Sequence, residues 1–145
     1  MPAKNINLAF EGYWRDINSG SVPAESGVYL VYRGTHNPDK TVTLHQLIYV
    51  GESDDVRKRI QAHEKRPTWK SYLKAGQELC FAFAPIAKPD RQRAEAALIF
   101  NHKPPVNDEY KTSFPFDETT VRSTGCCKFI EAVFTVRRTV PIGQR

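Results

Sequence analysis

The sequence predicts an α+β protein in which a small central antiparallel three-stranded sheet is flanked by helices. Residues 27–32 and 41–50 are rich in β-branched and aromatic side chains and lie on either side of a turn-rich segment, as in an antiparallel hairpin. A third strand is expected at 78–84, where similar side chains end at a proline. The alanine-rich segment 90–101 is expected to be a helix, which the following Pro-Pro pair prevents from continuing.

Shorter segments complete the expected fold. The apolar residues of 5–18 are spaced as in a short helix packed on the core. Ser53 is a suitable N-cap for a helix after the second strand, because the next two residues are acidic and favour the first turn. A further helix is expected at 68–74, and 129–136 is expected to add a final strand.

A chain of 145 residues has the usual size of one domain. We expect a core at 27–107, with 1–26 as an N-terminal extension packed on it. Residues 108–145 are expected to form a C-terminal extension of the same domain, with a basic end that frays.

The composition is that of a folded protein outside the membrane. Hydrophobic residues make up 40% of the chain and charged residues 26%, and no apolar run is long enough to span a bilayer. Asn5 and Asn7 interrupt the start, where a signal peptide needs a continuous apolar stretch. Three cysteines without zinc-ligand spacing are expected to be reduced thiols, so we expect a cytoplasmic location and no membrane partner.

The charge distribution is compatible with a nucleic-acid partner. The net charge is +5, and basic residues are concentrated between positions 57 and 74. The candidate nucleic-acid-binding residues are Arg57, Lys58, Lys65, Arg66 and Lys70. The alternative is a solvated helix face that is basic without binding anything.

Three charged or polar residues are expected on the apolar sides of helices. Arg59 and His63 are three or four positions from apolar residues of the first expected helix, and Glu95 is three positions before Leu98. A buried charge is costly unless it is paired. The structural alternative is that Glu95 pairs with Arg91 four positions away, while Arg59 extends to solvent.

The order of these residues resembles the GIY-YIG nuclease superfamily, in its stand-alone single-domain form. Five elements carry the resemblance: Gly27-Val28-Tyr29, Tyr49-Val50-Gly51, Arg59, His63, and Glu95 followed by Asn107. It covers about 26–107. The span between the two tyrosines is longer than usual in the family, and the excess is assigned to a hairpin loop at 33–46.

The resemblance implies a metal-dependent endonuclease that hydrolyses phosphodiester bonds, with DNA as the favoured substrate. Glu95 is implied to hold one Mg²⁺ or Mn²⁺ ion, and Arg59 to bind the phosphate. Tyr29 is implied to be the general base and Tyr49 to hydrogen-bond the water or the phosphate, although the two roles can be exchanged. His63 is implied to position the phosphate or relay a proton.

Gly27, Gly51 and Asn107 are implied to give structural support. Four other possibilities stay open: a homodimeric restriction-type enzyme, a nuclease toxin acting on RNA, a nucleic-acid-binding module without catalysis, and a protein-interaction domain.

Overall fold

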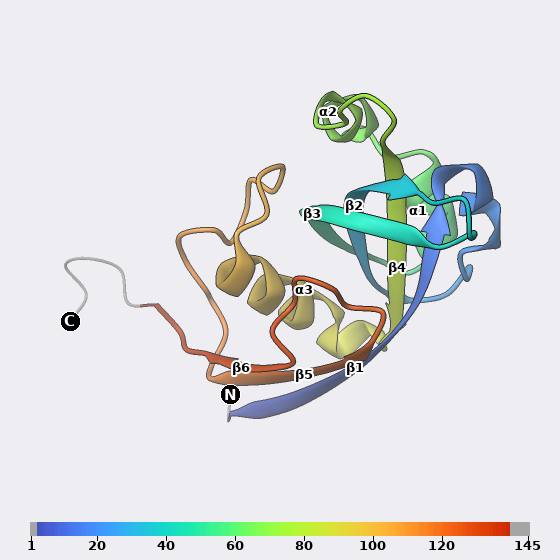
Figure 1. The fold of residues 1–145 in the computed structure, drawn as a ribbon. Helices are drawn as coiled ribbons and strands as arrows, with labels where there is room; N and C mark the ends of the chain where they lie inside the picture. Colours follow the sequence, from blue (N-terminus) through green and yellow to red (C-terminus); the bar gives the residue numbers. More distant parts are fainter. Residues whose placement is uncertain (1–2, 140–145) are drawn as a thin grey trace.

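The protein is built around one curled six-stranded sheet, described for residues 3–139 in a computed structural model (Figure 1). The strands lie side by side in the order β3-β2-β4-β1-β5-β6, and β1 and β5 form a parallel pair. The strands are β1 (Lys4–Arg15), β2 (Gly27–His36), β3 (Val42–Ser53), β4 (Glu78–Pro85), β5 (Thr119–Gly125) and β6 (Val133–Val136). The helices are the 3-10 helix η1 (Asp16–Ser21), α1 (Val56–Gln61), α2 (Arg66–Ser71) and α3 (Lys88–His102).

The expected small three-stranded antiparallel sheet flanked by helices is therefore wrong. Its three strands are present as β3-β2-β4, but they are half of a larger mixed sheet. The expected N-terminal helix is also wrong, because Ile6, Leu8 and Phe10 are buried at every second position, as in a strand with one face on the core. β1 joins β4, and β5 and β6 then extend the sheet beyond it.

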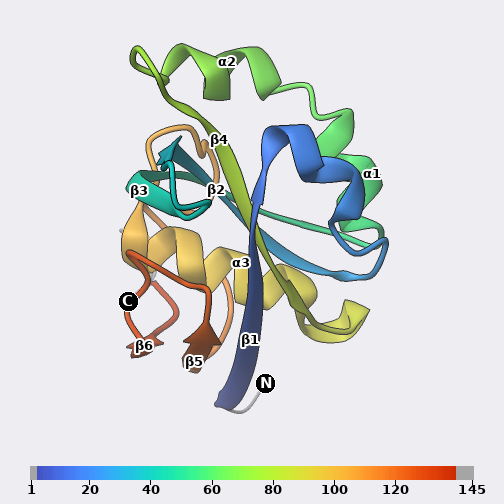
Figure 2. The same ribbon diagram turned by 45° about the vertical axis from the view of Figure 1, so that its right-hand side comes forward.

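β1 connects the two halves of the sheet. Its first half pairs with β5 and its second half with β4, with an irregularity between Gly12 and Trp14. The sheet curls, and α3 lies across its hollow side, between β1, β5 and β6 and the β2–β3 hairpin (Figures 1 and 2). One core fills the space between α3 and the sheet, and a second core lies under α1 and α2 on the opposite face of β2, β3 and β4.

The other expected elements are confirmed with changed boundaries. The hairpin is present, but the expected loop at 33–46 is mostly strand, because β2 continues to His36 and β3 begins at Val42. Register shifts after Val31 and Arg33 absorb the irregular spacing. The expected helix at 90–101 is α3, and the expected strand at 78–84 is β4.

Three local predictions need correction. Asp55, rather than Ser53, caps α1 by accepting a hydrogen bond from the Lys58 backbone, while the Ser53 hydroxyl accepts one from the Asp55 backbone. The helix expected at 68–74 lies at Arg66–Ser71, and the strand expected at 129–136 is limited to Val133–Val136. Of the basic end, 140–145 lies outside the described residues.

Among residues 3–139, no helix has the length and apolar character needed to cross a bilayer.

Candidate active site

The strand register places the two motif tyrosines on one face of the hairpin. Tyr29 is opposite Gly51 and Val31 is opposite Tyr49, so both phenol rings point to the α1 side, with centroids 6.2 Å apart. A Cβ at Gly51 would lie 2.3 Å from the Tyr29 hydroxyl oxygen. Gly51 therefore has to be glycine for the Tyr29 ring to occupy this position.

Both phenols are held in their neutral form. Tyr29 is 1% exposed, and burial raises its pKa well above the usual value, while the charge of Arg59 and a hydrogen bond from it act in the other direction. Tyr49 is 9% exposed, and burial, followed by the charge of Glu95, raises its pKa to about 12. Either tyrosine therefore needs additional positive charge nearby before it can accept a proton as phenolate.

Arg59 extends from α1 toward the protein surface. Val56 and Ile60 anchor α1 in the core, which leaves Arg59 between the core and solvent. Its guanidinium donates two hydrogen bonds, Nη1 and Nη2, to the two carboxylate oxygens of Glu64, at 2.8 and 2.9 Å. This two-bond geometry is the one in which arginine also binds phosphate.

His63 lies after the end of α1, in the turn that leads to α2, and not on the helix stripe that the sequence suggested. Its side chain has no exposed surface, and its ring packs against Trp69 and Tyr49, at centroid distances of 4.6 and 5.2 Å. Nδ1 accepts a hydrogen bond from the Lys65 backbone at 3.0 Å. Burial, followed by the charge of Arg59, lowers its pKa to about 4, so the ring is neutral at pH 7.

Glu95 points from α3 toward the outer edge of β3. Burial, followed by the charges of Glu52 and Glu109, raises the pKa of its carboxyl to about 8, although a backbone hydrogen bond from Glu52 opposes this. The structural alternative, an ion pair between Arg91 and Glu95, is not what the structure shows, because Arg91 instead pairs with Glu52 and hydrogen-bonds Ser26. Glu95 is thus a partly buried carboxyl in a negatively charged setting.

Glu95 and Tyr49 line one hollow of about 120 Å³. Its walls also include Lys65, Asn107, Asp108 and Glu109. Arg59 lines a separate hollow of about 280 Å³, together with Ser53, Asp54, Asp55 and Lys58. Arg59 and Glu95 therefore line different hollows, but the charge of each acts on both Tyr29 and Tyr49.

The residues implied to give structural support have clear contacts. The Asn107 side chain accepts from the Val50 N–H at 3.0 Å and donates to the Val50 carbonyl at 2.9 Å, while the Val106 N–H donates to the Ile48 carbonyl. These bonds occupy the outer edge of β3, where backbone groups would otherwise be unpaired. A Cβ at Gly27 would lie 2.3 Å from the Ala84 carbonyl oxygen, so β2 and β4 need glycine there.

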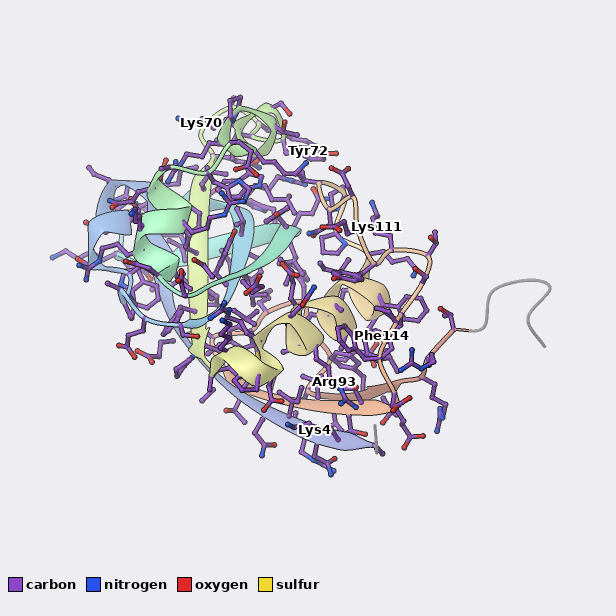
Figure 3. The ribbon with its side chains drawn as sticks, turned by 180° about the vertical axis from the view of Figure 1, so that it is seen from behind. Lys4, Lys70, Tyr72, Arg93, Lys111 and Phe114 are labelled. Atoms are coloured by element: carbon purple, nitrogen blue, oxygen red, sulfur yellow. The ribbon has the colours of Figure 1, made fainter. Side chains whose placement is uncertain are left out.

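The candidate nucleic-acid-binding residues fall into three groups. Arg57 and Arg66 make internal contacts: Arg57 donates to the Val22 carbonyl, and Arg66 pairs with Asp16 and donates to the Ile60 carbonyl. Lys65 forms an ion pair with Asp108 at 2.6 Å at the Glu95 hollow. Lys58 and Lys70 are exposed, and Figure 3 shows Lys70 on α2 and Lys111 on the segment after α3.

The chemistry of Glu95 fits a divalent cation, although in residues 3–139 no three His, Cys, Asp or Glu side chains are grouped as a metal site. Mg²⁺ is usually held by one or two carboxylates, together with water and substrate phosphate, so a complete protein cage is not needed. A carboxyl whose proton is retained by burial and by neighbouring negative charge gains most from a cation.

Four residues of the site were missed by the sequence reasoning. Glu64 binds Arg59, Asp108 binds Lys65, Glu52 lies next to Glu95, and Trp69 packs on His63. The five-residue spacing of Arg59 and Glu64 gives no helical signal, and the other pairs, apart from His63 and Trp69, join segments far apart in the chain.

No protein-family model, curated protein or solved structure matches this chain.

Proposed function

We propose that this protein is a GIY-YIG-type, metal-dependent nuclease that hydrolyses phosphodiester bonds, with DNA as the favoured substrate. The observation that carries the proposal is the position of Glu95. Its partly buried carboxyl has a pKa of about 8 and lines a polar hollow with Tyr49, and the charge of Arg59, which lines a separate hollow, acts on the same carboxyl. A carboxyl in this setting is suited to binding a cation, and an adjacent arginine is suited to binding the anion on which that cation acts.

Glu95 would hold one Mg²⁺ or Mn²⁺ ion. When bound, such an ion neutralises charge on the phosphate oxygens and stabilises the leaving oxygen. Lys65 and Asn107 lie on the same hollow, and Asn107 fixes the β3 edge on which Tyr49 is carried. The protein thus supplies the carboxylate and a rigid wall beside it.

Arg59 would bind the scissile phosphate with its two terminal nitrogens, the atoms that now bind Glu64. Its charge does not depend on pH in the range where enzymes act. Bound at this position, the phosphate lies close to the two phenols, whose ionisation Arg59 favours.

Tyr29 would accept the proton of the attacking water, and Tyr49 would orient the water or the phosphate. Tyr29 suits the base role because Arg59 both hydrogen-bonds it and favours its phenolate. His63, buried and neutral, would hold the Tyr49 ring in place. The three free cysteines fit the reducing cytoplasm, where we propose that the enzyme acts.

A substitution pair separates the two tyrosine roles. Loss of a general base typically lowers kcat by about 10²- to 10⁴-fold. We therefore expect Tyr29→Phe to lower kcat by at least that lower limit and Tyr49→Phe to lower it less. The reverse order would assign the base role to Tyr49.

The proposal is tested by incubating single-stranded, double-stranded and branched DNA, and RNA, with the wild-type protein and Mg²⁺ or Mn²⁺. We expect cleavage that EDTA stops and that Arg59→Ala and Glu95→Ala abolish. Glu118→Gln is the matched control, because Glu118 pairs with Arg137 away from the site. Salt-dependent binding without cleavage by any metal-loaded sample would instead identify a binding module.

A further inference from the structure

The turn formed by His63, Glu64 and Lys65 carries one acid and one base: Glu64 pairs with Arg59, which lines one hollow, and Lys65 lines the other. The His63 ring is fully buried, and its Nδ1 accepts from the Lys65 backbone, which fixes the turn. Glu64 reaches back to Arg59, and Lys65 reaches across to Asp108 in the segment after α3.

Two of the cations that line the hollows, Arg59 and Lys65, therefore bind carboxylates in the free protein. Arg59 makes two parallel hydrogen bonds to Glu64, and Lys65 makes one bond of 2.6 Å to Asp108. Carboxylates and phosphates bind guanidinium groups with the same geometry. The two acids occupy the positions that phosphate oxygens of a substrate would need.

We propose that Glu64 and Asp108 are competitive occupants of two phosphate positions, so that the site opens only to a strand with at least two phosphates. This inference rests on the proposed nuclease function and specifies its substrate as a polyanion. A single anion can displace one carboxylate, whereas a strand that replaces both gains two contacts in one binding event.

The exposure of the two acids makes this displacement feasible. The side chains of Glu64 and Asp108 are 64% and 77% exposed. An exposed ion pair favours the paired state by an equilibrium constant of about fivefold or less. The hydrogen bonds from Arg59 lower the pKa of Glu64 to about 2, so its carboxylate competes throughout the neutral range. The competition is thus strong enough to exclude weak anions and weak enough for a strand to overcome.

The test measures binding of a short fluorescent DNA strand in EDTA, where cleavage is stopped. We expect Glu64→Gln to tighten binding by about fivefold. Glu118→Gln removes the same charge from an Arg–Glu pair away from the site, and its effect should stay below about twofold. Asp108→Asn should tighten binding in the same sense as Glu64→Gln.

A double-mutant cycle shows whether Glu64 acts through Arg59. In an Arg59→Ala background, the gain from Glu64→Gln should fall to that of Glu118→Gln, because the contested position no longer exists. An equal gain in both backgrounds, or a gain no larger than that of Glu118→Gln, overturns the inference.

Substrate length gives an independent comparison. We expect inorganic phosphate to compete with the DNA strand weakly against wild type and more strongly against the Glu64→Gln variant. If wild type cleaves DNA but none of these differences is seen, the inference fails and the proposed function stands. If wild type neither binds nor cleaves any strand, both fail.

Discussion

Two ionisable side chains, Arg93 and Glu95, lie two positions apart on α3 and have opposite environments. Arg93 is buried toward β5, where it donates to the Thr119 hydroxyl and to the carbonyls of Asp117 and Glu118, at 2.7 to 3.1 Å. Glu95 faces the β3 edge, where its nearest charged neighbours include Glu52 and Glu109. Figure 3 shows Arg93 near β1 and β5, away from α2.

This difference separates a structural charge from a candidate functional one. The guanidinium of Arg93 joins α3 to β5 and to the segment before it through three oxygen acceptors, as expected of a buried polar group that supports the fold. The carboxyl of Glu95 keeps its proton above pH 7 because its surroundings are apolar and acidic. A buried charge that is fully satisfied stabilises the fold, whereas one that is destabilised points to a ligand.

The largest expected effect is on activity. Glu95→Gln should lower metal-dependent cleavage by about 10³-fold or more, since the amide keeps the shape of the side chain but cannot carry the charge that holds a divalent cation. Initial rates at saturating Mg²⁺ measure this effect. Unchanged cleavage would mean that Glu95 is not the metal ligand.

Arg93→Met should instead lower the free energy of unfolding by about 3 kcal/mol, because three oxygen acceptors lose a buried donor. Urea unfolding measures the loss, and cleavage per folded molecule should stay within about twofold of wild type. A loss of activity in fully folded Arg93→Met protein would contradict the separation of the two roles.

The Glu95 carboxyl should make stability depend on pH in metal-free buffer. Its pKa is about 8 in the fold against a usual 4.5, so its contribution is complete below pH 4.5 and is lost as the pH rises through 8. Glu95→Gln should therefore match wild type at pH 4 and exceed it by about 5 kcal/mol at pH 9. Thermal unfolding at both pH values measures this, and a stability difference between the two proteins that is the same at pH 4 and pH 9 would contradict it.

Asn107→Ala should have the smallest effect of this series, about 1 kcal/mol of unfolding free energy, through the two bonds to Val50. The same change should also lower cleavage, because the β3 edge supports Tyr49. Thermal unfolding and initial rates measure the two effects. Asn101→Ala, which removes an exposed contact to Glu131, is the control.

The sequence predicted local elements better than the way they combine. The hairpin and α3 were predicted from the composition and the spacing of apolar residues within single segments. Both are present, as β2 with β3 and as α3. The alternation of Ile6, Leu8 and Phe10 was a readable strand signal, but nearby aromatic residues suggested a helical spacing. β5 gives little signal, since Thr119 and Ser123 occupy two of its three buried positions. Its parallel partner β1 is more than a hundred residues away.

The candidate site shows the same limit. The spacing of the motifs predicted that Tyr29, Tyr49 and Gly51 lie together. The strand register places both tyrosine rings on one face of the hairpin, and the Tyr29 ring lies over Gly51. The carboxylates that bind Arg59 and Lys65 were not foreseen, because those pairs depend on where two loops fold.

The most direct test is an NMR titration of the Glu95 side-chain carboxyl carbon, with and without Mg²⁺. We expect a pKa near 8 in metal-free buffer and a clear decrease when Mg²⁺ is added, as the cation displaces the proton. A pKa near 4.5, or one that Mg²⁺ leaves unchanged, would contradict the assignment of Glu95 as the residue that holds the metal.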